Sequence, residues 1–185
     1  RELIANAYDA DAKTVSIITD APRFGSIKVS DDGVGMTPEV LANLVRHIGG
    51  SAKRTQKGPQ LGVTSQTDPT RSVGGRRLIG KIGIGLFSVA QLSRQFVITT
   101  KTAGTNYQLL THVTLNRFDE SELAKVDAEG KHPFQAGTAR IWPEKTPDKK
   151  GHGTTITLTA GDGRPLAGCR IYDGAVDGRA QESSN

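Results

Sequence analysis

Three polar side chains near the start of the chain share one face of a predicted helix. Glu2, Asn6 and Asp9 are spaced by four and then three residues, which places them on one helical face. The stretch RELIANAYDADA contains no Gly or Pro and predicts a helix that runs to about Ala12. An amide and two carboxylates suit a hard cation such as Mg²⁺ together with water. A solvated helix face explains the same stripe, so the spacing alone leaves both interpretations open.

A second polar group is the segment DDGVGM at 31–36, between a predicted strand and a predicted helix. A carboxylate at the strand end, Asp31, can accept a hydrogen bond from an exocyclic amine. Gly33 and Gly35 stand where the backbone can come close to a flat ligand. An ordinary turn also uses Asp and Gly, so this motif carries little weight by itself.

The third group is GKIGIG at 80–85, at the start of another predicted helix. Glycines at such a place, here Gly80, Gly83 and Gly85, let backbone N–H groups and the helix dipole meet an anion. Lys81 is either a phosphate contact or a surface lysine at the helix start.

Two familiar phosphate-binding motifs are excluded at this segment. Residues 75–81 match the first seven positions of a P-loop, but Ile82 stands where a Ser or Thr must bind Mg²⁺. A Rossmann fingerprint fails because its glycines have another spacing and because the preceding segment is a basic loop, not a strand.

Positive charge is concentrated in one part of the chain. The net charge is +5, and the segment 53–81 alone carries +6, from seven cations and one anion, Asp68. Such a segment attracts phosphate, whether of a nucleotide or of a nucleic acid, although a solvated loop is the ordinary explanation of a charge run.

The elements that must position these groups alternate in a recognisable order. A helix start at Thr37-Pro38-Glu39 predicts a helix to about Ile48, and a further helix is expected at 81–93 after a long loop at 51–80. We expect strands in TVSIITD, SIKVSD, QFVITTKT, NYQLLTHVTL and GTTITLT, and an irregular connection at 116–150. This order predicts an α+β, two-layer sandwich, with helices on one face of a mixed, mostly antiparallel sheet.

The totals fit a globular protein of one domain. The chain has 185 residues and one cysteine, Cys169, which excludes an internal disulfide and a thiolate zinc cage. Its longest apolar runs, such as 82–90, are too short to cross a bilayer, and we expect a cytoplasmic protein without a membrane partner. Because the chain begins at Arg1 inside a helical pattern, we expect it to be part of a longer protein.

Taken together, the motifs resemble one superfamily. ELIANAYDA looks like the N box, DDGVGM and GKIGIG like the two glycine boxes, and Gly153-Thr154 like the last adenine-side motif of the gyrase, heat-shock chaperone, histidine kinase and MutL (GHKL) superfamily. The resemblance covers about residues 1–160 and implies the Bergerat ATP-binding fold, truncated at its N-terminus. The tail at 161–185 has no counterpart and is expected to be poorly structured.

The resemblance implies a role for each polar residue of the first helix. Glu2 would be the general base or water-orienting group, Asn6 the Mg²⁺ ligand, and Asp9 a nearby polar group of the pocket. Sensor kinases usually carry Lys or Arg at the position of Asp9, so the resemblance is closer to the chaperone, MutL and MORC-type ATPases.

The other motifs would hold the nucleotide. Asp31 would accept a hydrogen bond from the adenine amine, helped by Thr154 and water, with Gly33, Gly35 and Met36 beside the base. The phosphates would be wrapped by Gly80, Gly83 and Gly85, with Lys81 as a candidate contact, under a mobile basic lid at about 51–79.

The function that this resemblance implies is binding and hydrolysis of ATP with Mg²⁺. Lid closure would then drive a conformational change, or homodimerisation through the ATPase region, in a larger protein. Two alternatives stay open: the catalytic domain of a protein-histidine kinase, and a nucleotide-gated binding module with negligible turnover whose basic lid contacts nucleic acid.

Overall fold

A computed structural model describes residues 1–46, 62–80, 89, 92–115 and 137–160. The elements in chain order are α1 (Glu2–Asp9), β1 (Val15–Thr19), β2 (Ser26–Asp31), α2 (Pro38–Arg46), β3 (Gln95–Lys101), β4 (Tyr107–Leu115), β5 (Gly137–Lys145) and β6 (Gly153–Thr159). Most of the predicted helix at 81–93, the first part of the expected lid and the tail at 161–185 lie outside the described residues. So do Lys81, Gly83 and Gly85.

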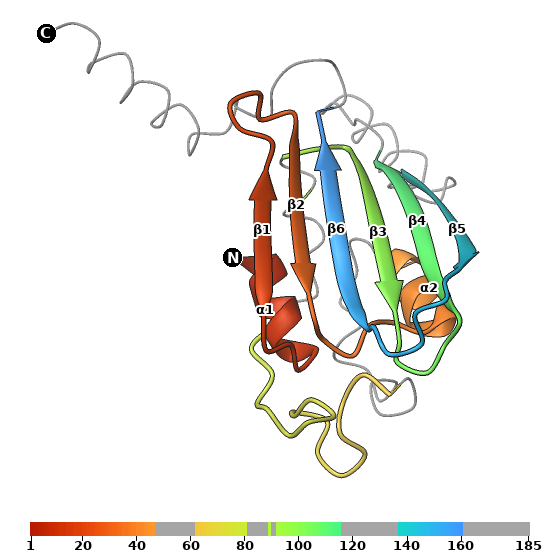
Figure 1. Ribbon diagram of the computed structural model, residues 1–185. Helices are drawn as coiled ribbons and strands as arrows, with labels where there is room; N and C mark the ends of the chain where they lie inside the picture. The colour runs from red at the N-terminus through yellow and green to blue at the C-terminus, as the bar shows by residue number, and fades with distance from the viewer. Residues whose placement is uncertain (47–61, 81–88, 90–91, 116–136, 161–185) are drawn as a thin grey trace, which may run out of the picture.

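The strands form one open sheet in the order β1-β2-β6-β3-β4-β5. Each pair of neighbours in this sheet is antiparallel. Both helices lie on the same face of the sheet, α1 near β1 and α2 near β4 (Figure 1). The predicted α+β architecture with helices on one face is therefore confirmed, and the five predicted strands are all present.

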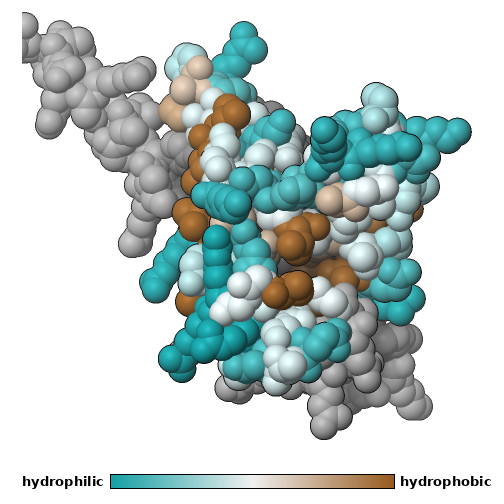
Figure 2. Space-filling view, turned by 60° about the horizontal axis from the view of Figure 1, so that its bottom comes forward, coloured by the Kyte–Doolittle hydropathy of each residue, from teal (hydrophilic) through white to brown (hydrophobic). Residues whose placement is uncertain are grey.

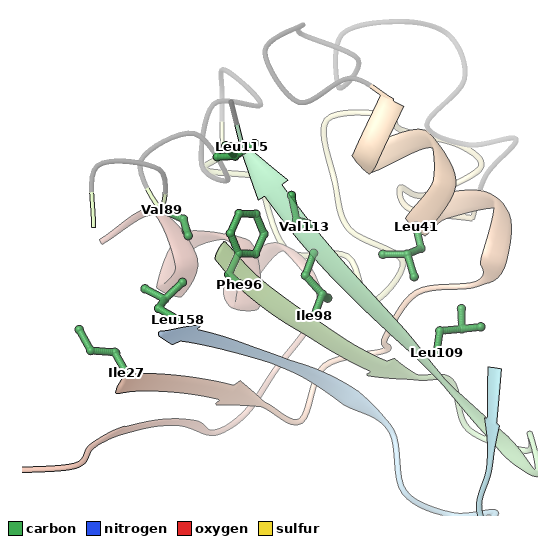
Figure 3. Close-up of a cluster of buried hydrophobic side chains, with 9 residues drawn as sticks. All are labelled: Ile27, Leu41, Val89, Phe96, Ile98, Leu109, Val113, Leu115 and Leu158. Carbon is green, nitrogen blue, oxygen red and sulfur yellow. The ribbon is translucent and has the colours of Figure 1, made fainter. Parts of the chain in front are cut away.

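The core lies between the sheet and the two helices. Figure 3 shows its nine buried side chains, of which seven come from β2, β3, β4 and β6, one is Leu41 of α2 and one is Val89. Burial alternates along β3, so that Phe96, Ile98 and Thr100 face the core. Leu41 of α2 is completely buried against them. Full burial of an apolar side chain such as Leu41 or Phe96 stabilises the fold by about 1.5–3 kcal/mol relative to its exposure to water.

The first helix ends three residues earlier than the sequence predicts. Asp11 has a left-handed backbone with φ of 61°. Its N–H bonds to the Tyr8 carbonyl at 3.1 Å, and the Ala12 N–H reaches back to the Ala7 carbonyl at 3.0 Å. These two bonds form a Schellman motif, which satisfies the last carbonyls and turns the chain out of the helix. Asp replaces the usual glycine here because a short polar side chain tolerates this conformation.

The second helix begins where the sequence predicts. The Thr37 hydroxyl lies 3.4 Å from the Val40 N–H at its N-terminus, and Glu39 follows in the first turn. The helix is described to Arg46, and its predicted end near Ile48 lies outside the described residues.

The expectation of an irregular connection over 116–150 is wrong in its second part. β5 pairs with β4 along its full length, from Tyr107 opposite Lys145 to Leu115 opposite Gly137. The strand was missed because it is an exposed edge strand without apolar alternation, and Pro143 is tolerated only at such an edge. Trp142 of this strand is 37% exposed, and the centre of its ring lies 4.9 Å from that of His112.

No helix within the described ranges is both long and apolar enough to cross a membrane.

Candidate functional site

Three polar residues form a row across three neighbouring strands, β2, β6 and β3, near the ends of these strands. Asp31 of β2 is paired with Thr154 of β6, and Thr154 is paired with Thr100 of β3. Because side chains alternate along a strand, Asp31 shares the face of Ile27, which belongs to the core. The row thus opens toward the helices, and it brings the predicted residues Asp31 and Thr154 together.

The carboxylate of Asp31 is half-buried and already oriented. Its Oδ1 accepts the Gly33 N–H at 2.9 Å and the Thr154 N–H at 3.3 Å. Burial is the largest influence on this group and raises the pKa of Asp31, although both backbone bonds oppose it. Among the described residues no donor reaches Oδ2. Oδ2 therefore keeps its capacity to accept hydrogen bonds, and it belongs to a partly buried carboxylate.

Thr100 is a residue of this row that the sequence did not single out. It is 1% exposed, and its hydroxyl lies 2.9 Å from the Met36 N–H, 3.0 Å from the Thr154 hydroxyl and 3.2 Å from the Gly153 carbonyl. One signal was available, because the alternation of β3 places Thr100 on the same face as Phe96 and Ile98. A threonine among such residues needs partners for its hydroxyl.

Two glycines of the segment 31–36 are required by close packing. A Cβ on Gly33 would lie 2.7 Å from the Ala10 carbonyl oxygen at the end of α1. A Cβ on Gly35, where φ is +71°, would overlap the Lys101 carbonyl of β3. The Val34 N–H also bonds to the Ala10 carbonyl at 2.9 Å. The segment is therefore wedged between α1 and the end of the sheet, with Met36 held by Thr100.

The three polar residues predicted to share a helix face all lie on α1. Glu2 is exposed in the first turn, and Asn6 is half-buried. Asp9 accepts the N–H groups of Ile79 and Gly80, each at 2.9 Å. Asp9 therefore anchors the start of the predicted phosphate-binding segment, so the structure brings two predicted site residues, Asp9 and Gly80, into contact.

The described half of the predicted lid forms a small hairpin on the end of α1. Arg71 pairs with Arg77 across the hairpin, and Asp11 accepts the Ser72 hydroxyl at 2.6 Å and the Gly74 N–H at 2.7 Å. Asp11 was not among the predicted site residues. The residues around Asp11 give no sign of these contacts, because the partners lie more than sixty residues further along the chain.

A cation of the hairpin completes the contact with α1. The Arg76 guanidinium donates to the Ala12 carbonyl at 2.7 Å and lies 5.1 Å from the centre of the Tyr8 ring. Arg76 also lies 3.9 Å from Asp11. A cation at the C-terminal end of a helix is favoured by the helix dipole. Part of the basic charge of 53–81 thus joins the hairpin to the helix.

The end of the molecule that carries these loops is not uniformly polar. Viewed from that side, hydrophobic groups lie among polar ones and border a hollow in the surface (Figure 2). Exposed apolar side chains come from both the segment 31–36 and the hairpin region, namely Val34, Val63, Val73 and Ile79. Apolar surface beside directed backbone and carboxylate groups suits a ligand with a flat aromatic part.

The donor set of the site fits a nucleotide with Mg²⁺ better than a metal bound by protein alone. Within the described ranges, no three His, Cys, Asp or Glu side chains gather closely enough to hold a metal ion. Mg²⁺ commonly keeps waters and takes one or two protein oxygens plus substrate phosphates. The amide oxygen of Asn6, which lies on α1 one turn before Asp9, is of the type that Mg²⁺ accepts as a ligand.

Comparison with known proteins gives one family and several curated relatives. Residues 1–154 match the family described as histidine kinase-, DNA gyrase B-, and HSP90-like ATPase. The chain is 31% identical to the chaperone protein HtpG of Gluconobacter oxydans over 122 residues, which are 57% of this chain and 18% of the relative. It is 29% identical to the HtpG of Pasteurella multocida over 175 residues, 85% of this chain and 23% of that protein.

A relative of another kind gives a similar match. The DNA mismatch repair protein MutL of Carboxydothermus hydrogenoformans is 29% identical over 115 residues, 60% of this chain and 17% of MutL. The chain spans about a fifth of the length of each of these relatives.

Proposed function

The chain belongs to the family of histidine kinase-, DNA gyrase B- and HSP90-like ATPases, and from this premise we propose that it binds ATP with Mg²⁺ and hydrolyses it. The observation that carries the proposal is the Asp31 carboxylate, which is half-buried and fixed through Oδ1, while Oδ2 has no donor among the described residues. Such an oxygen can accept a hydrogen bond from the 6-amino group of adenine.

The α1 side of the site is suited to the phosphates. Asp9 fixes the backbone at Gly80, where the glycine-rich segment begins. Asn6 would hold Mg²⁺, which neutralises phosphate charge when it is bound. This arrangement would place the triphosphate between the helix and the glycine-rich segment, with the base over the row of Asp31, Thr154 and Thr100.

Glu2 is the proposed catalytic residue. Its carboxylate lies one turn before Asn6 on the same helix face and is open to water. Water attacks the γ-phosphorus, the bond from that phosphorus to the bridging oxygen of ADP breaks, and Glu2 orients the water and accepts its proton. The similarity to HtpG and MutL supports hydrolysis over phosphoryl transfer to a histidine.

The test is to measure ATP binding and phosphate release by the wild type and by Glu2→Ala. Glu39→Ala is the matched control, because Glu39 is likewise an exposed acid in the first turn of a helix, α2. We expect Glu2→Ala to bind ATP normally and to release phosphate about 100-fold or more slowly, with no change in the control. Undiminished release by Glu2→Ala contradicts the catalytic role, and a wild type that does not bind ATP contradicts the whole proposal.

We propose that closure of the segment 51–79 over ATP drives rearrangement or homodimerisation, and that the protein is cytoplasmic. The match to the ATPase family is the support for the first of these proposals.

A further inference from the structure

We propose that Thr100 is a positioning residue that sets adenine specificity, by fixing the direction in which the Thr154 hydroxyl donates its proton. The inference rests on the proposed ATP site and extends it to a residue on a third strand. Thr100 stands at the β3 end of the row and is 1% exposed, so it acts through Thr154 and Met36 rather than through its own contact with the base.

The hydroxyl of Thr100 has as many partners as it can take. A threonine hydroxyl has one proton and two lone pairs. The Met36 N–H, which can only donate, occupies one lone pair, and the Gly153 carbonyl, which can only accept, lies 3.2 Å from the oxygen. If Thr100 donates to Gly153, its second lone pair is left for the proton of the Thr154 hydroxyl, 3.0 Å away.

The reverse arrangement satisfies fewer groups. If Thr100 donated to Thr154 instead, the Gly153 carbonyl would lose this donor, and a lone pair of a fully buried hydroxyl would remain empty. Buried polar groups strongly favour the arrangement with all partners filled. Thr154 therefore donates toward Thr100 and presents only lone pairs to the space beside Asp31.

This direction has a consequence for the ligand. In its ionised form the Asp31 carboxylate also offers only acceptor capacity to that space. Two adjacent acceptors favour a ligand group with two protons, directly or through a shared water, and the 6-amino group of adenine is such a group. They disfavour a purine that has no donor at this position.

The experiment is a binding cycle with ATP and purine riboside 5′-triphosphate, which lacks only the 6-amino group. Dissociation constants are measured by calorimetry for the wild type, Thr100→Val, Thr100→Ser and Thr99→Val. Valine keeps the shape of threonine and removes the hydroxyl, whereas serine keeps the hydroxyl. Thr99 is the matched control because it is the next residue of β3 and faces the opposite side of the sheet.

We expect the preference of the wild type for ATP over purine riboside 5′-triphosphate to fall about three- to tenfold in Thr100→Val. Thr100→Ser and Thr99→Val should keep the wild-type preference. A merely structural role would weaken both ligands equally, because neither the sugar nor the phosphates differ.

The inference is overturned if Thr100→Val keeps the wild-type preference, whether both affinities stay the same or fall by the same factor. That result refutes the role of Thr100 and leaves ATP binding standing. A wild type that binds neither triphosphate refutes the proposed function itself. If Thr100→Val does not fold, Thr100→Ser decides: a lost preference despite a retained hydroxyl contradicts the account.

Discussion

The two ends of the site are built by different means. At the proposed base end, Asp31, Thr154 and Thr100 come together through strand register, so their relative positions follow from the backbone ladder of the sheet. At the proposed phosphate end, a loop segment is attached to α1 by the carboxylates of Asp9 and Asp11. The base end is therefore preorganised, whereas the phosphate end depends on a few side chains whose removal frees a whole segment.

Glycines at the two ends provide the largest expected contrast. Gly153, at φ +129°, has no room for a Cβ, which would overlap the Asp31 carbonyl, whereas Gly75 at the hairpin, with φ +89°, has open space around it. We expect Gly153→Ala to lower the free energy of unfolding by about 3 kcal/mol or more. Gly75→Ala should cost only about 1–2 kcal/mol. Chemical denaturation measures both, and equal losses would contradict the contrast.

Removing Asp11 tests the attachment of the hairpin. In Asp11→Ala the Gly74 N–H and the Ser72 hydroxyl lose their acceptor. We expect protection of the Gly74 amide from hydrogen exchange to fall about 10- to 100-fold. The affinity for adenosine should not change, because the base end does not depend on the hairpin.

The control for this prediction is Asp68→Ala, which removes an exposed carboxylate whose partners within the described ranges are Thr70 and Arg71 of the same region. It should leave the Gly74 amide protected. A loss of adenosine affinity in Asp11→Ala would show that the two ends are not independent.

The neighbouring carboxyls Asp31 and Asp32 should respond to pH in opposite directions. Burial raises the pKa of Asp31, so its contribution to stability is complete at low pH and is lost as the pH rises through that pKa. Backbone hydrogen bonds from Thr14 and Lys13 lower the pKa of Asp32. Its contribution is present at neutral pH and is lost as the pH falls through the lowered pKa.

The measurement is the free energy of unfolding of Asp31→Asn and Asp32→Asn as a function of pH. At neutral pH we expect Asp31→Asn to be more stable than the wild type and Asp32→Asn to be less stable. Both differences should shrink as the pH falls toward the acid range. If Asp31→Asn is less stable than the wild type at neutral pH, the hydrogen bonds to the carboxylate stabilise the fold by more than the burial of its charge destabilises it. That result would contradict the raised pKa of Asp31.

The smallest effect is expected at a second buried threonine. Thr111 of β4 is completely buried, and its hydroxyl has no hydrogen-bond partner among the described residues. Thr111→Val should therefore be neutral or raise the free energy of unfolding by up to about 1 kcal/mol, since it removes a buried polar atom without breaking a bond. Thermal unfolding of Thr111→Val and Thr100→Val, measured side by side, tests this prediction. An equal loss of stability in the two variants would show that the two buried hydroxyls do not differ.

The sequence predicted the architecture because five strands and two helices carry strong local signals. It placed Asp31 and Thr154 correctly at strand ends through motif resemblance. It missed β5, since an exposed edge strand lacks apolar alternation. It also missed Thr100 and Asp11, whose roles arise from partners more than fifty residues away. Contacts of this length depend on strand register and loop packing, which local patterns do not specify.

The most direct test of the account is the affinity of Asp31→Asn for adenosine, measured by calorimetry. The variant keeps an oxygen for the Gly33 and Thr154 N–H groups and turns an NH₂ group, which can only donate, toward the ligand. We predict a folded protein without detectable adenosine binding, beside an Asp32→Asn control that binds as the wild type does. Wild-type affinity in Asp31→Asn would contradict the proposed nucleotide site.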